Sequence, residues 1–513
     1  MKPTYLQLLC AAGLAPLGAC QQSPSTPPKP NVIIIYADDL GFGDLSCNGA
    51  KTIATPNTDR VAQEGLRCTN AHTAAATSTP ARYGLLTGQY PWRKAGTGIA
   101  TGDAGMIIRP EQYTLPDLFK SAGYTTGAIG KWHLGLGDTA GTQNWNGEIR
   151  PGLSDIGFDY SFIMAATGDR VPCVYIENQR VVNLEPSDPI AVSYTTPFAG
   201  EPTGKENPEL LRIHPSDGHD QAIINGIPRI GYMKGGKNAL WKDELIGDRI
   251  TEKALAFIRD NKDKPFFLYF GTNDVHVPRV PNERFVGKSG MGPRGDAILS
   301  FDYAIGQVTA CLEELGIADN TLLIISSDNG PVVDDGYKDQ AVELLGDHKP
   351  WGDYRGGKYS AFEAGTRVPF IARWNKHIPA GSQSNVLLSH IDLYASLAAL
   401  CEAEIPAGAA PDSRNRLDAF LGKSDVGSDY VVEYSLTQAL SVIVGDWKYI
   451  EPNNGPAINI GTNTELGNLP TDQLYNLQAD PNERHNLAAE NPEKTAELKA
   501  LLAQIKADGG IQI

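Results

Sequence analysis

The sequence predicts an α/β protein with a mostly parallel central sheet flanked by helices, followed by a smaller antiparallel sheet with a helix. Two observations indicate this fold class. Short runs of apolar, β-branched residues alternate with helical patterns through most of the chain, as in parallel sheets that helices cover on both faces. Beyond about Asp425 the strand-like runs become short and consecutive, which is typical of antiparallel hairpins.

Five buried strands and three helices are expected in the α/β part. The run 31–37 (NVIIIYA) shows why, because it is continuously apolar, rich in β-branched residues and ends in a pair of aspartates, as expected of a buried parallel strand. Similar runs predict strands at 125–129, 265–270, 321–326 and 369–373, and helical patterns occur at 114–122, 242–259 and 300–315.

The predicted domain division follows from changes in composition and in hydrophobic periodicity along the chain. Residues 138–238 are rich in Pro, Gly and Asp without clear periodicity, so we expect loops around the mouth of a site. We predict an N-terminal catalytic domain at 31–424 and a C-terminal subdomain at 425–513. In the subdomain, strands at 430–434, 439–444 and 448–450 precede a last helix at 492–507.

Composition limits the class of protein. The chain has 513 residues, of which 41% are hydrophobic, and a formal net charge of −16. These values exclude a disulfide mini-protein, a disordered tail and a polytopic membrane protein. The acidic balance and the lack of a long Lys/Arg block argue against nucleic acid as a partner. The cysteines are widely spaced without a CxxC pair, so we expect neither a zinc site nor a disulfide framework.

Residues 1–20 have the features of a signal peptide. Lys2 precedes an apolar run at 6–17, which is too short to span a bilayer. Leu17-Gly18-Ala19-Cys20 resembles the bacterial lipoprotein box, which implies export and a lipid on Cys20, at the periplasmic side or the cell surface of a bacterium. An ordinary cleaved signal with a chance cysteine is the alternative. Residues 21–30, polar and rich in proline, are expected to form a tether.

Polar side chains follow three of the predicted strands. Asp38 and Asp39 come after the first, Asn273-Asp274-Val275-His276 after the third, and Asp328-Asn329 after the fourth. Ligand sites in open parallel sheets lie beyond the carboxyl ends of the strands. We therefore expect these polar groups to converge on one edge of the sheet.

The segment 77–88 (TSTPARYGLLTG) resembles the signature of the type I sulfatases, Cys/Ser-x-Pro-x-Arg followed by Thr-Gly. The rest of the chain resembles other elements of that family in the same order, from about Pro30 to the C-terminal helix. The family has an alkaline-phosphatase-like fold, so the resemblance implies that fold and a sulfuric ester hydrolase. The matching segments are Asp38-Asp39, Lys131-Trp132-His133, His276-Val277-Pro278, Asp328-Asn329-Gly330, and Lys358 with Glu363-Ala364-Gly365.

The resemblance also implies two cofactors. In this family the signature Cys or Ser is oxidised to formylglycine, so we expect a sulfatase-maturing enzyme that accepts serine to act on Ser78. The second is Ca²⁺, since the oxygens gathered here suit a hard cation and lack the imidazoles that zinc prefers. The expected metal ligands are Asp38, Asp39, Ser78, Asp328 and Asn329.

The implied chemistry needs positive charge and proton donors around a sulfate ester. By resemblance, hydrated formylglycine attacks sulfur, His276 with help from Lys358 protonates the leaving alcohol, and His133 takes the proton of the second hydroxyl to release sulfate. The positive charges hold residue 78 and the sulfate oxygens. The expected catalytic residues are Ser78, Arg82, Lys131, His133, His276 and Lys358.

Two segments point to the substrate. Asp169-Arg170 and Asp347-His348 resemble segments of bacterial carbohydrate sulfatases acting on galactose-type or N-acetylgalactosamine-type sugars. An Asp/His pair can bind an axial hydroxyl that a gluco-configured sugar lacks. We therefore expect these four residues to bind substrate, in an exo-acting 6-O-sulfatase on galactose or N-acetylgalactosamine termini of glycans.

Two other functions stay open from the sequence. One is a phosphatase or phosphodiesterase of the alkaline-phosphatase-like superfamily, although the additional His and Asp ligands of a second metal are missing. The other is a non-catalytic, lipid-anchored glycan-binding protein in which Ser78 is never oxidised.

Overall fold

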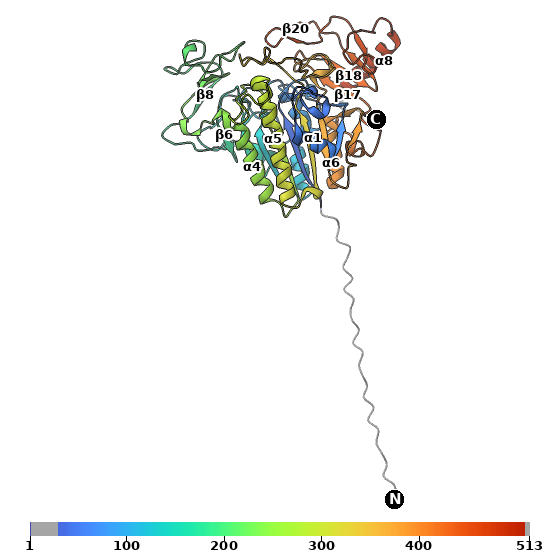
Figure 1. The fold of residues 1–513 in the computed structure, drawn as a ribbon, viewed down its shortest axis with the longest axis horizontal. Helices are drawn as coiled ribbons and strands as arrows, with labels where there is room; N and C mark the ends of the chain where they lie inside the picture. The colour runs from blue at the N-terminus through green and yellow to red at the C-terminus, as the bar shows by residue number, and fades with distance from the viewer. Residues whose placement is uncertain (2–28, 508–513) are drawn as a thin grey trace.

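The computed structural model describes Met1 and residues 29–507, which fold around one ten-stranded sheet (Figure 1). The predicted signal peptide and most of the predicted tether therefore lie outside the described residues. The strand order is β15-β2-β14-β13-β1-β12-β4-β5-β6-β7, and its five central strands, from β13 to β5, run parallel. The expected fold class is confirmed. In sheet order these strands are β15 (Ser382–Ser384), β2 (Leu66–Cys68), β14 (Phe370–Arg373), β13 (Thr321–Ser327), β1 (Asn31–Ala37), β12 (Phe266–Gly271), β4 (Thr125–Lys131), β5 (Tyr160–Met164), β6 (Tyr175–Glu177) and β7 (Arg180–Val181).

Helices cover both faces of this sheet, as the side chains of β1 show. Val32, Ile34 and Tyr36 join the hydrophobic core on one face, whereas Ile33 and Ile35 join the core on the other, because successive residues of a strand point to opposite faces. Burial of each such side chain stabilises the fold by about 1.5–3 kcal/mol. The helices are α2 (Ser78–Thr87), α3 (Leu115–Ser121) and α6 (Leu393–Cys401) on the first face, and α1 (Pro56–Gln63), α4 (Ile246–Asp260) and α5 (Gly292–Glu314) on the second.

Several boundaries differ from the prediction. Helix α5 begins at Gly292 and not at residue 300, because its first turn, Gly292-Pro293-Arg294-Gly295, has the composition of a loop although Pro is well accommodated there. The predicted helix at 242–259 is a 3-10 turn, Asp243–Leu245, followed by α4. The region 138–238 is not all loop, since β5 pairs with β4 and so joins the central sheet.

The C-terminal part forms a four-stranded antiparallel sheet that α8 (Pro492–Ala507) covers. The predicted strands and the last helix are present. The fourth strand, β22, was not predicted, because it follows a Gly/Asn/Thr-rich stretch that reads as loop. The strands are β17 (Val431–Tyr434), β18 (Leu440–Val444), β19 (Trp447–Ile450) and β22 (Gln473–Asn476).

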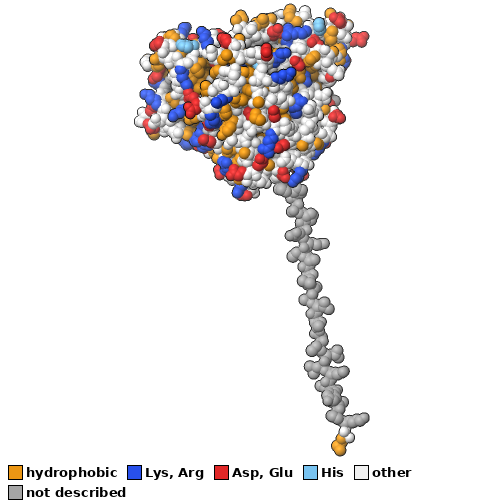
Figure 2. All heavy atoms as spheres, in the orientation of Figure 1, with side chains coloured by type: hydrophobic (Ala, Val, Ile, Leu, Met, Phe, Trp, Pro, Cys, Tyr) orange, Lys and Arg blue, Asp and Glu red, His pale blue; other side chains and the backbone are white. Residues whose placement is uncertain are grey.

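Short two-stranded sheets and one short helix complete the fold. None of the helices in the described part of the chain has both the length and the hydropathy of a membrane span. On the face shown in Figure 2, acidic and basic side chains are interspersed. The short elements are β3 (Ala71–His72) with β16 (Leu388–Ser389), β8 (Ala191–Ser193) with β11 (Tyr232–Lys234), β9 (Ile223–Ile224) with β10 (Ile227–Pro228), β20 (Ile458–Asn459) with β21 (Thr464–Glu465), and α7 (Leu417–Phe420).

Buried charges connect the C-terminal sheet to the rest of the molecule. The ammonium of Lys448 on β19 lies 2.8 Å from Glu433, 3.1 Å from Glu363 and 3.4 Å from Glu483, and the Lys448 side chain is completely buried. Burial raises the pKa of Glu483 to about 8, and the nearby carboxylate of Glu363 acts in the same direction. Lys448 therefore supplies the positive charge that these carboxylates share.

We predict that Lys448→Met lowers the free energy of unfolding by about 3–5 kcal/mol, because it leaves buried carboxylates without their cation. Lys506→Met is the matched control, since Lys506 on α8 makes an exposed ion pair with Glu451 at 2.9 Å and should contribute less than about 1 kcal/mol. Urea denaturation of both variants measures the difference. Equal, small effects would contradict the assignment.

Candidate active site

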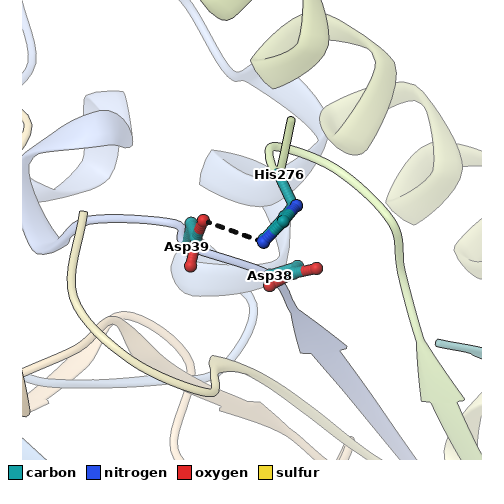
Figure 3. Close-up of side chains that lie close together, drawn as sticks. All are labelled: Asp38, Asp39 and His276. Atoms are coloured by element: carbon teal, nitrogen blue, oxygen red, sulfur yellow. Dashed lines mark ion pairs between the residues drawn. The ribbon is translucent and has the colours of Figure 1, made fainter. Parts of the chain in front are cut away.

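The candidate site lies at the carboxyl edge of the central sheet. Strands β13, β1 and β12 are neighbours there, and the polar residues that follow them meet as predicted. Asp38 and Asp39 follow β1, and the His276 ring that follows β12 lies with its Nε2 3.8 Å from Asp39 Oδ2 (Figure 3). Asp328 follows β13, and its Oδ1 accepts a hydrogen bond of 3.2 Å from the Asp39 backbone N–H.

The backbone of Asp39 has a conformation that is unusual for a residue with a side chain. Its φ is +61°, in the left-handed region, which costs a non-glycine residue about 1 kcal/mol or more. Two hydrogen bonds hold it there: one from its N–H to Asp328, and one of 2.8 Å from Asn329 Nδ2 to its Oδ1. This turn allows two consecutive carboxylates to reach the same site.

Ser78 is the first residue of α2, after Thr77 in an extended conformation. Its hydroxyl lies 3.4 Å from Asp38 Oδ1 and 3.3 Å from Asn329 Oδ1, and Lys131 Nζ donates to it at 2.6 Å. The amino end of a helix favours negative charge. An oxygen nucleophile at position 78 is therefore held among a lysine, a helix terminus and carboxylates.

Two buried cations surround Asp328. Arg82 donates to its Oδ2 from Nε at 3.0 Å and from Nη2 at 2.8 Å, and Lys131 Nζ lies 3.3 Å from the same oxygen. Burial opposes ionisation, but these two charges outweigh it and hold the pKa of Asp328 well below its ordinary value. Tyr269, which was not predicted, accepts a hydrogen bond of 2.7 Å from Arg82 through its hydroxyl.

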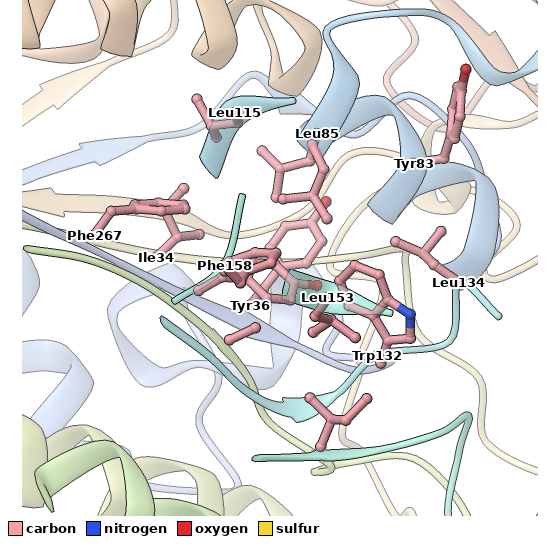
Figure 4. Packing of buried hydrophobic residues seen from close by; sticks show 14 of the residues in the cluster. Ile34, Tyr36, Tyr83, Leu85, Leu115, Trp132, Leu134, Leu153, Phe158 and Phe267 are labelled. Carbon is pink, nitrogen blue, oxygen red and sulfur yellow. The ribbon is translucent and has the colours of Figure 1, made fainter. Parts of the chain in front are cut away.

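Core packing fixes the segments that carry these charges. Tyr83 and Trp132, the neighbours of Arg82 and Lys131, are completely buried members of the core in Figure 4. The indole N–H of Trp132 donates to the Gly135 carbonyl at 2.9 Å. Because each polar residue alternates with a packed one, the polar side chains have little freedom to leave the site.

The oxygens around Ser78 fit a calcium ion. Asp38 Oδ2 is buried and has no hydrogen-bond partner among the described residues, and burial raises the pKa of this carboxyl to about 6. A carboxylate in this position needs additional positive charge. The donor set is all oxygen, which suits a hard cation; the residues that would hold it are Asp38, Asp39, Ser78, Asp328 and Asn329.

A second group of charges lies on the other side of Asp39. Lys358 Nζ donates to Asp39 Oδ2 and to Asp335 Oδ2, each at 2.8 Å. Burial opposes the charge, but Asp335 and Asp39 raise the pKa of Lys358 well above its ordinary value. His276 Nδ1 contacts the Val277 carbonyl at 2.7 Å, so this nitrogen carries the hydrogen and Nε2 faces the site. Asp335 was missed because nothing in its sequence context marks it.

His133 has the geometry of a neutral imidazole. Its Nε2 donates to the Ala100 carbonyl at 2.9 Å, and its buried Nδ1 finds no partner within the described chain. Burial, followed by the charge of Lys131, lowers the pKa of His133 well below its ordinary value. Nδ1 is thus available to accept a proton.

These groups enclose a pocket of about 40 Å³. A pocket of this size can hold a small charged group and leaves a sugar ring at its mouth. The structure therefore brings most of the predicted catalytic and substrate-binding residues to one place. The lining residues are Thr77, Ser78, Ile99, His133, Asp169, Arg170, His219, His276, Asp335, Lys358 and Tyr359.

The mouth carries an acidic residue between two basic ones. Arg170 Nη1 and His219 Nε2 each lie 2.9 Å from Asp169 Oδ2. Burial alone would raise the pKa of Asp169, but Arg170 and the two neighbouring imidazoles hold it well below its ordinary value. Burial would likewise lower the pKa of His219, yet the Asp169 hydrogen bond raises it. His219 was missed, since a single histidine in an aperiodic region carries no signal.

The structure does not bring Asp347 and His348 to this pocket. They line a separate cavity of about 570 Å³, so the prediction that they bind the sugar beside Asp169 is corrected. Both nitrogens of the buried His348 ring are already engaged, Nε2 with Asp44 Oδ1 at 2.8 Å and Nδ1 with Thr52 Oγ1 at 2.6 Å. The Asp/His pair at the mouth is Asp169 with His219.

Comparisons with known proteins agree with this site. A family model described as sulfatase matches residues 30–403. The chain is 54% identical over 511 residues to the N-acetylgalactosamine-6-O-sulfatase of Bacteroides thetaiotaomicron, covering 99% of this chain and 100% of that protein. It is 29% identical over 526 residues to human arylsulfatase A, covering 97% of this chain and 90% of the relative.

A solved structure is also similar throughout. It comes from work on the metabolism of multiple glycosaminoglycans by Bacteroides thetaiotaomicron, and it superposes with a TM-score of 0.92 at 55% identity, covering 93% of this chain and 99% of that one. The family match spans most of the chain and includes Ser78 and the charged groups around it. The chain therefore belongs to the sulfatase family and is a sulfuric ester hydrolase.

Proposed function

We propose that this sulfatase removes 6-O-sulfate from N-acetylgalactosamine, or from galactose, at the termini of glycans, through a formylglycine made from Ser78. The observation that carries the proposal is the group of Asp169, Arg170 and His219 at the mouth of a small pocket lined by charged groups. The 54% identical relative named N-acetylgalactosamine-6-O-sulfatase supports the same substrate.

The size and charge of the pocket suit a sulfate ester. Lys131 and Lys358 lie on opposite sides of the Asp38-Asp39 pair, with Arg82 behind Lys131 and Arg170 at the mouth. Fixed positive groups in a water-poor site stabilise the negative charge that develops when a sulfate ester breaks. The small volume favours one terminal sulfate, with the sugar outside, and so favours an exo-acting enzyme.

Each residue has a step that its geometry allows. A formylglycine at position 78 would supply a hydrated aldehyde as the nucleophile, and Ca²⁺ held by the surrounding oxygens would supply positive charge beside it. Lys131, 2.6 Å from the residue-78 oxygen, orients that oxygen and favours its anion. His276, as an imidazolium whose Nε2–H faces the site, and Lys358 can donate a proton to the leaving alcohol. His133 Nδ1 can accept one when sulfate is released.

The residues at the mouth can distinguish sugar configurations. Asp169 can accept a hydrogen bond from a hydroxyl, and Arg170 can donate to its oxygen. Both ring nitrogens of His219 are engaged, one with the Asp217 carbonyl at 2.9 Å and one with Asp169, so His219 orients Asp169. An axial C4 hydroxyl, as in galactose-configured sugars, projects from the ring where an equatorial hydroxyl does not. A gluco-configured sugar would not make the hydrogen bond to Asp169 and would bind less tightly.

We further propose that the protein is exported and anchored by a lipid on Cys20, and that a maturing enzyme oxidises Ser78. The supporting observations are the signal-peptide pattern at 1–20 with its Leu-Gly-Ala-Cys segment, and a serine in place of cysteine in the signature. A periplasmic or cell-surface location would bring the enzyme to its glycan.

Oxidation of Ser78 tests the enzyme against a purely glycan-binding protein. Mass spectrometry of the Ser78 peptide, from protein made in its native host, should show the loss of two hydrogens. Ser78→Ala should release no sulfate from N-acetylgalactosamine 6-sulfate while keeping the unfolding temperature of the wild type. Ser193→Ala, on the short strand β8, is the control and should stay active. Unmodified serine in every molecule would refute the proposal.

Substrate selectivity tests the group at the mouth. The wild type should prefer N-acetylgalactosamine 6-sulfate over N-acetylglucosamine 6-sulfate. His219→Ala should lower kcat/KM for the galacto substrate by roughly 10–100-fold and for the gluco substrate far less, because His219 orients Asp169 and only the galacto substrate uses the Asp169 hydrogen bond. The exposed His485 provides the control variant His485→Ala. Equal losses on both substrates would show that His219 does not select configuration.

Thermal unfolding tests the calcium site. Ca²⁺ at about 100 times its dissociation constant should stabilise the protein by about 2.7 kcal/mol, and a chelator should reverse the effect. Asp39→Asn, which removes one of the proposed ligand charges, should weaken the response, whereas Asp353→Asn at an exposed position should not. A wild-type response in Asp39→Asn would exclude Asp39 as a ligand.

A further inference from the structure

A second cavity, here called the Trp351 cavity, lies beside the active-site pocket and has no role in the function proposed above. Its volume is about 480 Å³, and its lining includes Asp334, Trp351, Arg355, Ile460 and Arg484. This volume is within the range of small-molecule sites. Its lining combines apolar surfaces with charged groups.

The two cavities share a wall. The wall consists of segments 331–335 and 355–359, which the Lys358 backbone N–H joins by donating to the Pro331 carbonyl at 2.9 Å. Asp335 and Lys358 line the active-site pocket, whereas their near neighbours Asp334 and Arg355 line the Trp351 cavity.

The loop that carries His219 reaches the same wall. Ser216 Oγ donates to Asp334 Oδ1 at 2.7 Å, and the Ser216 N–H donates to the Gly336 carbonyl at 2.9 Å. The residue that contacts Asp169 at the pocket mouth is therefore three residues from the edge of the Trp351 cavity. The loop that carries the pocket residue His219 is thus hydrogen-bonded to the segment that separates the two cavities.

The far wall of the cavity belongs to the C-terminal part. The turn between β20 and β21 carries Ile460, whose side chain is 93% exposed, and Figure 1 shows β20 above the end of the sheet where the active site lies. The Arg484 side chain is 56% exposed, and its ion pair with Glu465 is loose, at 3.7 Å. Its guanidinium therefore has N–H groups that can donate to another acceptor. Ile460 and Trp351 both line the cavity, so its lining offers apolar surface beside the charged groups.

We propose that the Trp351 cavity binds the sugar that follows the sulfated residue in an oligosaccharide substrate. This inference rests on the proposed function. The active-site pocket holds only the sulfate, so the sulfated ring lies at the mouth and the next ring lies beyond it. The C–H face of that ring packs on Trp351 and Ile460, while its hydroxyls reach Asp334 and Arg484.

The test compares two substrates that carry the same sulfated residue: N-acetylgalactosamine 6-sulfate, and an oligosaccharide with that residue at its non-reducing end. The wild type should have the higher kcat/KM for the oligosaccharide. Trp351→Ala should lower kcat/KM for the oligosaccharide by roughly tenfold and change that for the monosaccharide by less than about twofold.

Ile460→Ala is a second cavity variant, for the case that Trp351→Ala disturbs folding. The exposed Ile460 side chain is not part of a hydrophobic core, so its removal should leave the fold intact. This variant should lower kcat/KM for the oligosaccharide alone, by about threefold. Val286→Ala is the matched control, since Val286 is 60% exposed and outside the cavity. The inference would be overturned if both cavity variants had equal effects on the two substrates. It would also be overturned if the wild type had the same kcat/KM for the monosaccharide and the oligosaccharide.

Binding separates this inference from the proposed function. A Ser78→Ala protein binds substrate without turnover. Calorimetry should show that adding Trp351→Ala weakens the binding of the oligosaccharide by roughly tenfold and leaves the binding of the monosaccharide unchanged. A wild type that releases sulfate from neither substrate refutes the proposed function. An oligosaccharide affinity that does not change with Trp351→Ala, or the lack of oligosaccharide binding, refutes the cavity assignment.

Discussion

The site depends on keeping carboxylates ionised at the end of a hydrophobic sheet. Asp38, Asp39 and Asp328 are completely buried, and burying an isolated carboxylate costs several kcal/mol. Arg82 and Lys131 offset this cost at Asp328 and, for Lys131, at Asp38. The same cations lie next to residue 78, so the charges that make the site stable also prepare it for an anionic substrate.

The C-terminal sheet supports this arrangement from outside. Glu363 lies five residues after Lys358, and its side chain meets Lys448 of β19 in a fully buried ion pair. Gly330, next to the proposed ligand Asn329, approaches the Ala364 carbonyl so closely that an added Cβ would lie 1.6 Å from it. The loop that delivers Lys358 is thus held between the edge of the central sheet that carries Asn329 and the C-terminal sheet.

Much of the site was predictable because its residues sit in short linear patterns. Asp38, Asp328 and His276 each follow a buried strand, and the carboxyl ends of neighbouring parallel strands must share an edge. His219, Asp335 and Tyr269 were not predictable, since each reaches the site from a segment whose local sequence indicates only loop or core. His348 shows the opposite error, because a suggestive neighbour in the sequence does not reveal that a buried Asp44 already binds the ring.

The sequence by itself determined the α/β class, the positions of the main strands along the chain, the cationic and carboxylate residues of the centre, and the family, because these depend on local apolar runs and on contiguous motifs. Only the tertiary structure decided which Asp/His pair lines the active-site pocket, how Lys448 connects the two parts, and that β5 joins the sheet. Those features depend on contacts between residues far apart in the chain, and on burial that decides which polar groups are already paired. The fold class predicted from alternating runs is therefore correct, but the surface that selects a sugar belongs to loops that alternation does not describe.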